Sequence, residues 1–175
     1  MSAGEKGTLI SGVGGQGIVF AGRLLARAWF SQGKHVALRH AYGAEVMGTA
    51  VHSEILVSSN PIPCPYLEVA DVALVLHSAA VGEVLPRLAP GALLVTDEGV
   101  NLGGASDGLR VEVRPFTAAA ERGLMGDPGR ASPLVGLGCL GRLEVVDLDA
   151  LLAVIGRDRA SEDNVRLVRM GYSLI

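Results

Sequence analysis

The sequence predicts an α/β fold, a three-layer sandwich with a mostly parallel sheet. Short apolar runs typical of buried strands, such as residues 72–76 and 93–96, alternate along the chain with segments of helical periodicity. Hydrophobic residues make up 49% of the 175 residues and charged residues only 19%, which suits a sheet that helices cover on both faces. No repeat or linker divides the chain, so we expect a single domain over residues 1–175.

The first predicted strand runs directly into a glycine-rich turn. Residues 8–11 form a short apolar run, and apolar residues recur at helical spacing from Ala21 to Trp29. A turn between a strand and a helix N-terminus exposes backbone N–H groups and favours negative charge. The glycine spacing fits the G-x-G-x-x-G dinucleotide fingerprint and predicts a Rossmann-like turn. The candidate phosphate-binding residues are Gly12, Gly14, Gly15, Gln16 and Gly17.

Two other interpretations of the turn stay open. The fingerprint expects a carboxylate at the end of the second strand, for a ribose hydroxyl, but the strand predicted at residues 35–38 is followed by Arg39 and His40. Because Arg39 would suit a 2′-phosphate, a free-standing NADP-binding oxidoreductase or a nucleotide-binding regulatory module remains an alternative. In the other interpretation, the glycines serve only the tight packing of the strand against the helix.

Composition and charge exclude several classes of function. The net charge is −3 and the basic residues form no run, which argues against nucleic-acid binding. No apolar stretch reaches the ~18 residues that a membrane span needs. Residues 1–6 are too polar for a signal peptide, so we expect a cytoplasmic protein. The low share of charged residues also predicts that part of the surface is buried in a complex.

The cysteines predict no metal site. Cys64 and Cys139 lie far apart, and no Cys-x-x-Cys motif is present, so neither an iron–sulfur cluster nor a zinc knuckle is expected. Cys139, between a glycine and a leucine, is expected to be buried, and Cys64, among prolines, to be exposed. Because no nucleophile–base pair or carboxylate pair appears either, no catalytic residue is predicted.

In the first half of the chain, Gly33 is expected to end the first helix. Residues 51–58 alternate between apolar and polar positions, which predicts a strand less buried than its neighbours and near an edge. Alternating prolines at 61–65 predict a rigid loop. The continuous apolar run at 72–76 predicts a central parallel strand.

In the second half, residues 79–88 predict a short helix, Pro90 and Gly91 a turn, and residues 93–96 a buried strand. Residues 109–114 alternate strictly and predict a strand with one solvated face. Helices are then expected at four places: an alanine-rich helix after residues 115–117, a helix from 132 to about 140, a helix over 148–155 capped by Asp147, and a last helix capped by Ser161 and ended by Gly171.

In open α/β sheets, ligands bind beyond the carboxyl ends of the strands. The glycine turn, the loop over residues 39–49 and the pair His77 and Ser78 all follow predicted strands. We therefore expect a ligand site where these three segments meet.

Several motifs resemble the gamma subunit of the 2-oxoacid:ferredoxin oxidoreductases, which act on pyruvate, 2-oxoisovalerate, 2-oxoglutarate or indolepyruvate. The likeness covers nearly the whole chain, and the tyrosine–glycine loop inclines it toward the 2-oxoglutarate type. The motifs are Gly12-Val13-Gly14-Gly15-Gln16-Gly17-Ile18, Tyr42-Gly43-Ala44-Glu45, the strand after Asp71, Leu137-Gly138-Cys139-Leu140, and Glu162-Asp163-Asn164 with Gly171-Tyr172.

The resemblance implies an accessory subunit without chemistry of its own. Such complexes decarboxylate a 2-oxoacid on thiamine pyrophosphate, pass electrons through iron–sulfur clusters to ferredoxin and transfer the acyl group to coenzyme A. Thiamine and clusters belong to the alpha, beta or delta partners, and the gamma part is implicated in coenzyme A binding. The isolated chain is then expected to be inactive and to form a homodimer. The ligand contacts expected beyond the glycine turn are Arg39, Tyr42, Gly43 and Glu45.

One departure from the family pattern concerns the loop after Tyr42. The family continues from Tyr-Gly-x-Glu into Arg-Gly-Gly, whereas this chain has Met47-Gly48-Thr49, or Val46-Met47-Gly48 with a gap. An arginine offers a planar fork to a carboxylate or phosphate, and methionine does not. Either Arg39 replaces the lost arginine, or the chain is a divergent member with an altered substrate.

Overall fold

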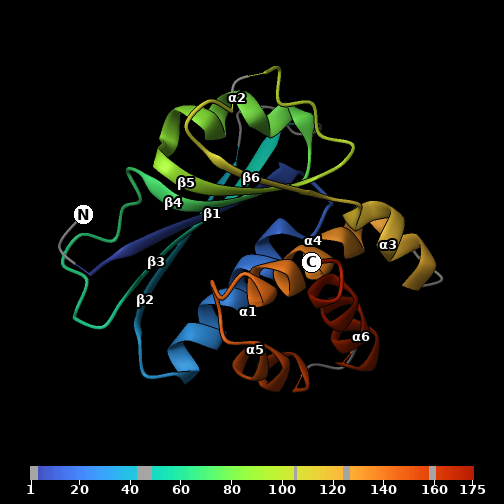
Figure 1. Cartoon of the computed structure of the whole chain (residues 1–175). Helices are drawn as coiled ribbons and strands as arrows, with labels where there is room; N and C mark the ends of the chain where they lie inside the picture. Colours follow the sequence, from blue (N-terminus) through green and yellow to red (C-terminus); the bar gives the residue numbers. More distant parts are fainter. Residues whose placement is uncertain (1–3, 43–48, 105, 124–126, 158–160) are drawn as a thin grey trace.

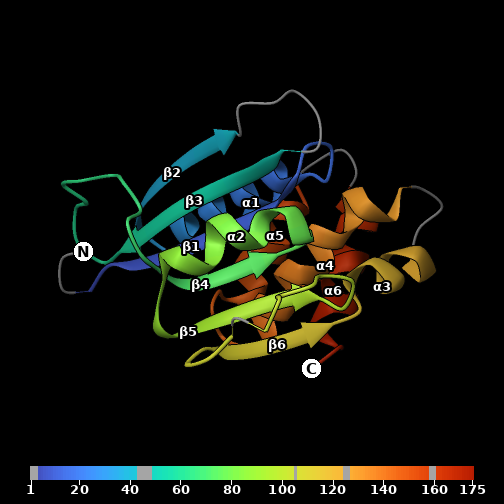
Figure 2. The same cartoon turned by 90° about the horizontal axis from the view of Figure 1, so that it is seen from above.

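A computed structural model describes residues 4–42, 49–104, 106–123, 127–157 and 161–175. Six strands form one mixed sheet in the order β2-β3-β1-β4-β5-β6 (Figure 2). Strand β3 runs antiparallel to the other five strands, which all point the same way, so the expected mostly parallel sheet is confirmed. The strands are β1 (Lys6–Val13), β2 (His35–Tyr42), β3 (Ala50–Ser58), β4 (Ala70–Val75), β5 (Leu88–Asp97) and β6 (Arg110–Arg114).

Helices flank the sheet unequally on its two faces (Figure 1). The larger group packs on one face around Trp29, Phe116 and Leu137, and the short α2 covers the other around Leu9 and Leu94. Both faces of the central strands are therefore buried, as their continuous apolar runs predict. The helices are α1 (Ile18–Ser31), α2 (Val81–Val84), α3 (Phe116–Gly123), α4 (Pro128–Arg142), α5 (Leu148–Ile155) and α6 (Ser161–Tyr172).

Strand β3 lies next to the edge strand β2, as predicted, but the prediction that it is less buried than its neighbours is wrong. It pairs with β2 on one side and β1 on the other, and all nine of its residues are buried. Its polar side chains are buried because each finds a partner: His52 lies 2.8 Å from Ser11 Oγ, and Ser53 lies 3.0 Å from His40 Nδ1. Paired polar groups tolerate burial that unpaired ones do not.

Helices α4 and α6 pack at backbone distance. A side chain at Gly138 would overlap the Val168 carbonyl, and one at Gly171 the Val135 carbonyl. Gly171 is the penultimate residue of α6, so the prediction that it lies at the end of this helix is confirmed. The close approach of the Val135 carbonyl gives a second reason for glycine at this position. The expected cap, Ser161, is itself the first residue of α6, and its side chain lies outside the described part of the chain.

The bounds of three other predicted elements differ from those in the structure. The helix expected over 79–88 consists of α2 between the 3₁₀ turns Ser78–Ala80 and Leu85–Arg87. The turn expected at Pro90 and Gly91 lies inside β5, because the Gly91 N–H donates to the Gly108 carbonyl and the register shifts there. Helix α4 begins before residue 132, capped by Asp127.

Two predicted helix ends are confirmed. Gly33 follows α1 with φ +75, and the Lys34 N–H donates to the Trp29 carbonyl, as in a glycine-terminated helix. The Asp147 carboxylate accepts a 2.7 Å hydrogen bond from the Ala150 N–H and caps α5.

Candidate functional site

The chain turns sharply between β1 and α1 at residues 14–16. The Gln16 N–H donates to the Val13 carbonyl at 3.2 Å, and Gly15 and Gly17 adopt φ of +89 and +78. Gly17 is the N-cap of α1. Left-handed backbone at two of four positions explains why glycine is needed here.

The Gln16 side chain folds back onto the turn. Its Oε1 accepts from the Val13 N–H at 2.8 Å, and its Nε2 donates to the Leu76 carbonyl at 3.4 Å. These contacts link the carboxyl ends of β1 and β4. A side chain at Gly12 would collide with Gln16 Oε1 and with Ile18, so Gly12 provides the space that Gln16 occupies. Gly12 and Gln16 therefore maintain the conformation of the turn.

Gly14 and Gly15 form the open part of the turn. Both are exposed, and nothing lies within 4 Å of where their side chains would be. Within the described part of the chain, neither backbone N–H donates a hydrogen bond. The site of a Gly17 side chain, by contrast, lies 3.1 Å from the Arg130 carbonyl oxygen. The approach to the N-terminus of α1 is therefore open at Gly14 and Gly15.

The segment after β4 adjoins this turn, as expected. The Leu76 N–H donates to the Ser11 carbonyl at 2.8 Å, so His77 and Ser78 follow directly beside the end of β1. His77 Nδ1 accepts from the Ala79 N–H and caps the 3₁₀ turn. The imidazole is exposed. Ser78 Oγ accepts from the Asn101 N–H and so holds the loop after β5.

Tyr42 and Arg39 occupy different levels of β2. Through β3, Tyr42 is level with Gly12, whereas Arg39 is level with Leu9, inside the sheet. Tyr42 is 67% exposed at the same sheet edge as the turn. Gly43, Glu45 and the Met47 region lie outside the described residues.

Arg39 belongs to a charge cluster around the buried Glu54, which the sequence did not predict. Glu54, 4% exposed, accepts from Arg39 at 3.0 Å and from Arg87 at 2.8 Å. The Arg39 guanidinium also lies over the Tyr66 ring, 5.3 Å from its centroid. Arg39 bonds Glu54 through its Nε, and its side chain is 50% exposed. The available signal was a glutamate in a strand segment that ends in the apolar run Ile55-Leu56-Val57.

Two titratable groups are shifted by burial. Burial, with the positive charge of Arg23, lowers the pKa of His40. Burial raises the pKa of the Cys139 thiol to about 12, and its Sγ lies 3.1 Å from the Gly171 carbonyl oxygen. Cys139 is therefore buried and Cys64 exposed, as predicted. Within the described ranges, no group of three or more potential ligands could hold a metal ion.

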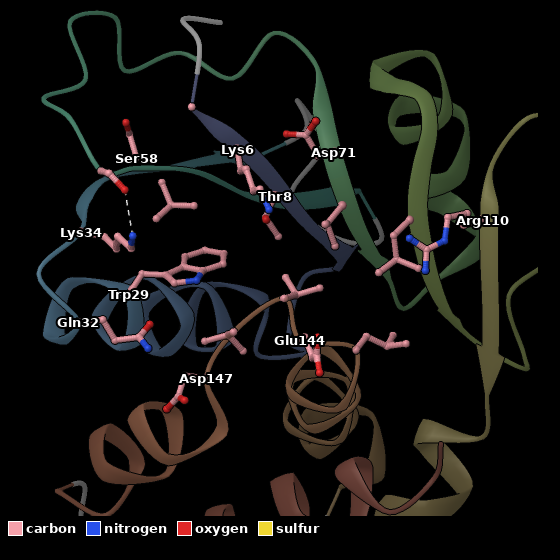
Figure 3. Close-up of a pocket in the computed structure, with 18 of the residues that line it drawn as sticks. Lys6, Thr8, Trp29, Gln32, Lys34, Ser58, Asp71, Arg110, Glu144 and Asp147 are labelled. Carbon is pink, nitrogen blue, oxygen red and sulfur yellow. Dashed lines mark hydrogen bonds between the residues drawn. The ribbon is translucent and has the colours of Figure 1, made fainter.

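A cavity of about 520 Å³ lies at the opposite edge of the sheet from the glycine turn (Figure 3). The amino ends of β1, β4, β5 and β6 form one wall, and the end of α1 with the α4–α5 connection forms the other. This edge was not expected to hold a site. Its polar lining includes Lys6, Thr8, Gln32, Lys34, Ser58, Asp71, Arg110, Glu144 and Asp147.

Comparison with known proteins defines the class. Residues 7–174 match the pyruvate ferredoxin/flavodoxin oxidoreductase family, and the chain belongs to that family. It is 33% identical over 171 residues to the 2-oxoglutarate synthase subunit KorC of Archaeoglobus fulgidus, covering 97% of this chain and 88% of that subunit. The ketoisovalerate oxidoreductase subunit VorA of Methanothermobacter marburgensis is 25% identical over 93% of this chain, which matches 35% of VorA.

Solved structures support the same family assignment. The gamma subunit of a keto/oxoacid ferredoxin oxidoreductase from Geobacter sulfurreducens superposes with a TM-score of 0.84 at 25% identity, over 98% of this chain and 97% of that one. A Magnetococcus marinus 2-oxoglutarate:ferredoxin oxidoreductase, solved with 2-oxoglutarate, coenzyme A and succinyl-CoA, has the same fold over 99% of this chain (TM-score 0.86, 21% identity) and 31% of its own. The chain is thus a gamma-type subunit of a 2-oxoacid:ferredoxin oxidoreductase. No helix in the described ranges is long and apolar enough to cross a membrane.

Proposed function

We propose that this chain contributes a coenzyme A phosphate contact to a thiamine-pyrophosphate-dependent 2-oxoacid:ferredoxin oxidoreductase that forms an acyl-CoA. The observation that carries the proposal is the open turn at Gly14 and Gly15, whose N–H groups have no partner within the described residues. They precede a helix of 14 residues, and a helix N-terminus stabilises a phosphate by N–H donation and by its dipole.

The substrate we propose is 2-oxoglutarate. The Archaeoglobus fulgidus relative is a 2-oxoglutarate synthase subunit, and the Magnetococcus marinus enzyme was solved with 2-oxoglutarate and succinyl-CoA. Thiamine pyrophosphate and iron–sulfur clusters would reside in alpha, beta and possibly delta partners, with ferredoxin as electron acceptor. The chain itself supplies no catalytic residue in this proposal and works in the cytoplasm.

The site would include the loop that follows β2. Tyr42 lies at the same edge as the turn and is exposed, so its ring is available to a ligand or a partner subunit. We propose the same site for Gly43 and Glu45. Arg39 would contribute only after leaving Glu54, and this engagement also removes support from an NADP site, which needs a free arginine for the 2′-phosphate.

A Gly14→Val substitution tests the turn. The position is open and its φ is not left-handed, so valine fits the folded chain but covers the N–H groups that a phosphate would approach. We expect coenzyme A affinity of the assembled complex to fall at least tenfold, measured by titration calorimetry. The matched control is Gly82→Val in α2, where the side chain also meets open space. Equal coenzyme A affinity in the Gly14→Val complex and wild type would remove the turn from the coenzyme site.

A further inference from the structure

The cavity at the amino edge of the sheet is not used by the proposed function. Its volume of about 520 Å³ lies within the roughly 300–1,000 Å³ of small-molecule sites. It is built from elements that are far apart in the sequence: the start of β1, the end of α1 and the α4–α5 connection (Figure 3). Ligands of this cavity would not compete with those of the glycine turn.

Two buried polar groups in the cavity wall lack partners. Thr8 is 2% exposed and Trp29 is 6% exposed, and both line the cavity between β1 and α1 (Figure 3). Within the described part of the chain, neither the Thr8 hydroxyl nor the Trp29 indole N–H makes a hydrogen bond. Buried polar groups are nearly always bonded to protein or to ordered water, so these two donors are available to a polar molecule that enters the cavity.

Both of these groups can donate. Ser58, although 4% exposed, alternates with Val57 along β3 and so lies on the other face of the sheet, where its Oγ accepts from the Asn60 N–H at 3.0 Å. The indole N–H of Trp29 can only donate, and the Thr8 hydroxyl can do so as well. The buried part of the wall therefore suits an acceptor group such as a carboxylate.

The charged groups of the α4–α5 wall are both carboxylates, whereas the sheet wall carries three cations and one carboxylate, Asp71. The carboxylates of Glu144 and Asp147 lie on the α4–α5 side, and Asp147 already uses one oxygen to cap α5. On the sheet side, Asp71 accepts from the Gly7 N–H. Glu144 makes no ion pair within the described ranges, and its φ of 60 is left-handed. The cations on the sheet side are Lys6, Lys34 and Arg110 (Figure 3).

We propose that this cavity binds a small zwitterion of the α-amino acid class. The carboxylate faces the donors of Thr8 and Trp29 and the cations of the sheet edge. The ammonium group faces Glu144 and Asp147. A neutral or singly charged molecule would leave one wall without its counterpart.

Trp29 makes the test specific, because it is the only tryptophan of the chain. The ¹H–¹⁵N spectrum of the full chain then holds one indole resonance, which lies in the proposed site. Each standard L-amino acid is added in turn, beside the hydroxy acid and the amine with the same side chain. We expect at least one amino acid to shift this resonance saturably, with both analogues binding at least tenfold more weakly. No saturable shift with any amino acid, or equal affinity for an analogue, would overturn the proposal.

Two variants locate the binding. Thr8→Val keeps the side-chain shape and removes a hydroxyl that has no protein partner, so the melting temperature should not fall while affinity for the identified amino acid drops at least tenfold. Glu144→Gln should weaken binding several-fold, whereas Glu98→Gln, an exposed glutamate beyond the end of β5, should not. Unchanged affinity in both Thr8→Val and Glu144→Gln would refute the assignment.

Discussion

At the scale of the residue, Glu54 shows how this sheet accommodates a buried charge. Its carboxylate is 4% exposed, and two arginines hold its two oxygens separately. Arg87 also donates to the Leu67 carbonyl at 2.8 Å. A buried ion is tolerated when its charge is compensated and its hydrogen bonds are complete, and it becomes costly when a partner is removed.

Glu54→Gln should therefore destabilise the chain strongly. The substitution keeps the shape and leaves Arg39 and Arg87 without a counter-charge. We expect a loss of about 2–3 kcal/mol in the free energy of unfolding, measured in urea. This is below the ~3–5 kcal/mol of a fully buried pair, because the Arg39 side chain is 50% exposed and water screens it.

The control for this prediction is Glu98→Gln, at an exposed site. Surface substitutions of this kind usually change stability by less than about 0.5 kcal/mol. If Glu54→Gln and Glu98→Gln changed the free energy of unfolding equally little, the ion pairs of Glu54 would contribute no net stability.

At the scale of the element, the α4–α6 contact depends on glycine more than on apolar side chains. At Gly138, the nearest atoms to a side chain would be the backbone of Val168 and of Tyr172, which cannot move away by rotamer change. At Gly141, one turn later in the same helix, the nearest atom is Leu148 Cδ1 at 3.4 Å. The two positions therefore hold the same residue in the same helix, but a side chain has room only at 141.

Gly138→Ala and Gly141→Ala form a matched pair. Alanine at 138 must push α6 away, and we expect a loss of about 3 kcal/mol or more, since overpacking costs ~1–3 kcal/mol even where side chains can adjust. Alanine at 141 gains helix propensity of up to ~1 kcal/mol and should be neutral or stabilising. Thermal melts of both variants suffice; similar melting temperatures would show that α4 and α6 are not in backbone contact.

At the scale of the whole molecule, exposed aromatic side chains accompany an unusually apolar composition. Tyr42 is 67% exposed and Tyr66 is 56% exposed, and they lie within the segments 39–49 and 60–66 that we expect at a subunit interface. Aromatic residues are enriched in the centres of interfaces. In the assembled enzyme, this surface would face the partner subunits.

The isolated chain should form a symmetric dimer through these segments, because two-fold pairing is the commonest closed association. A specific interface would bury more than about 1,000 Å². Size-exclusion chromatography with light scattering should give twice the monomer mass. Tyr42→Ser should shift the equilibrium toward monomer, whereas Phe30→Ser, 72% exposed on α1, should not. A wild-type monomer at high concentration would contradict the prediction.

Much of the proposed coenzyme site could be anticipated from local sequence. The glycines after β1, the segment after β4 and the tyrosine after β2 all lie at one sheet edge, because parallel strands end together. The roles of Gln16 and Arg39 could not be anticipated from local sequence. Gln16 binds the Leu76 carbonyl, and Arg39 binds Glu54, and both contacts depend on strand order, which no local pattern encodes.

The sequence by itself determined the features that short-range physics decides: the alternation of strands and helices, the left-handed end of α1 at Gly33 and the cap of α5 at Asp147. Only the tertiary structure decided why β3 is buried with its polar residues, why α4 and α6 need glycine at 138 and 171, and where the amino-edge cavity lies. Caps and turns are formed by residues a few positions apart. Buried polar pairs, backbone contacts between helices and cavities join distant segments, so their energies appear only once the chain has folded.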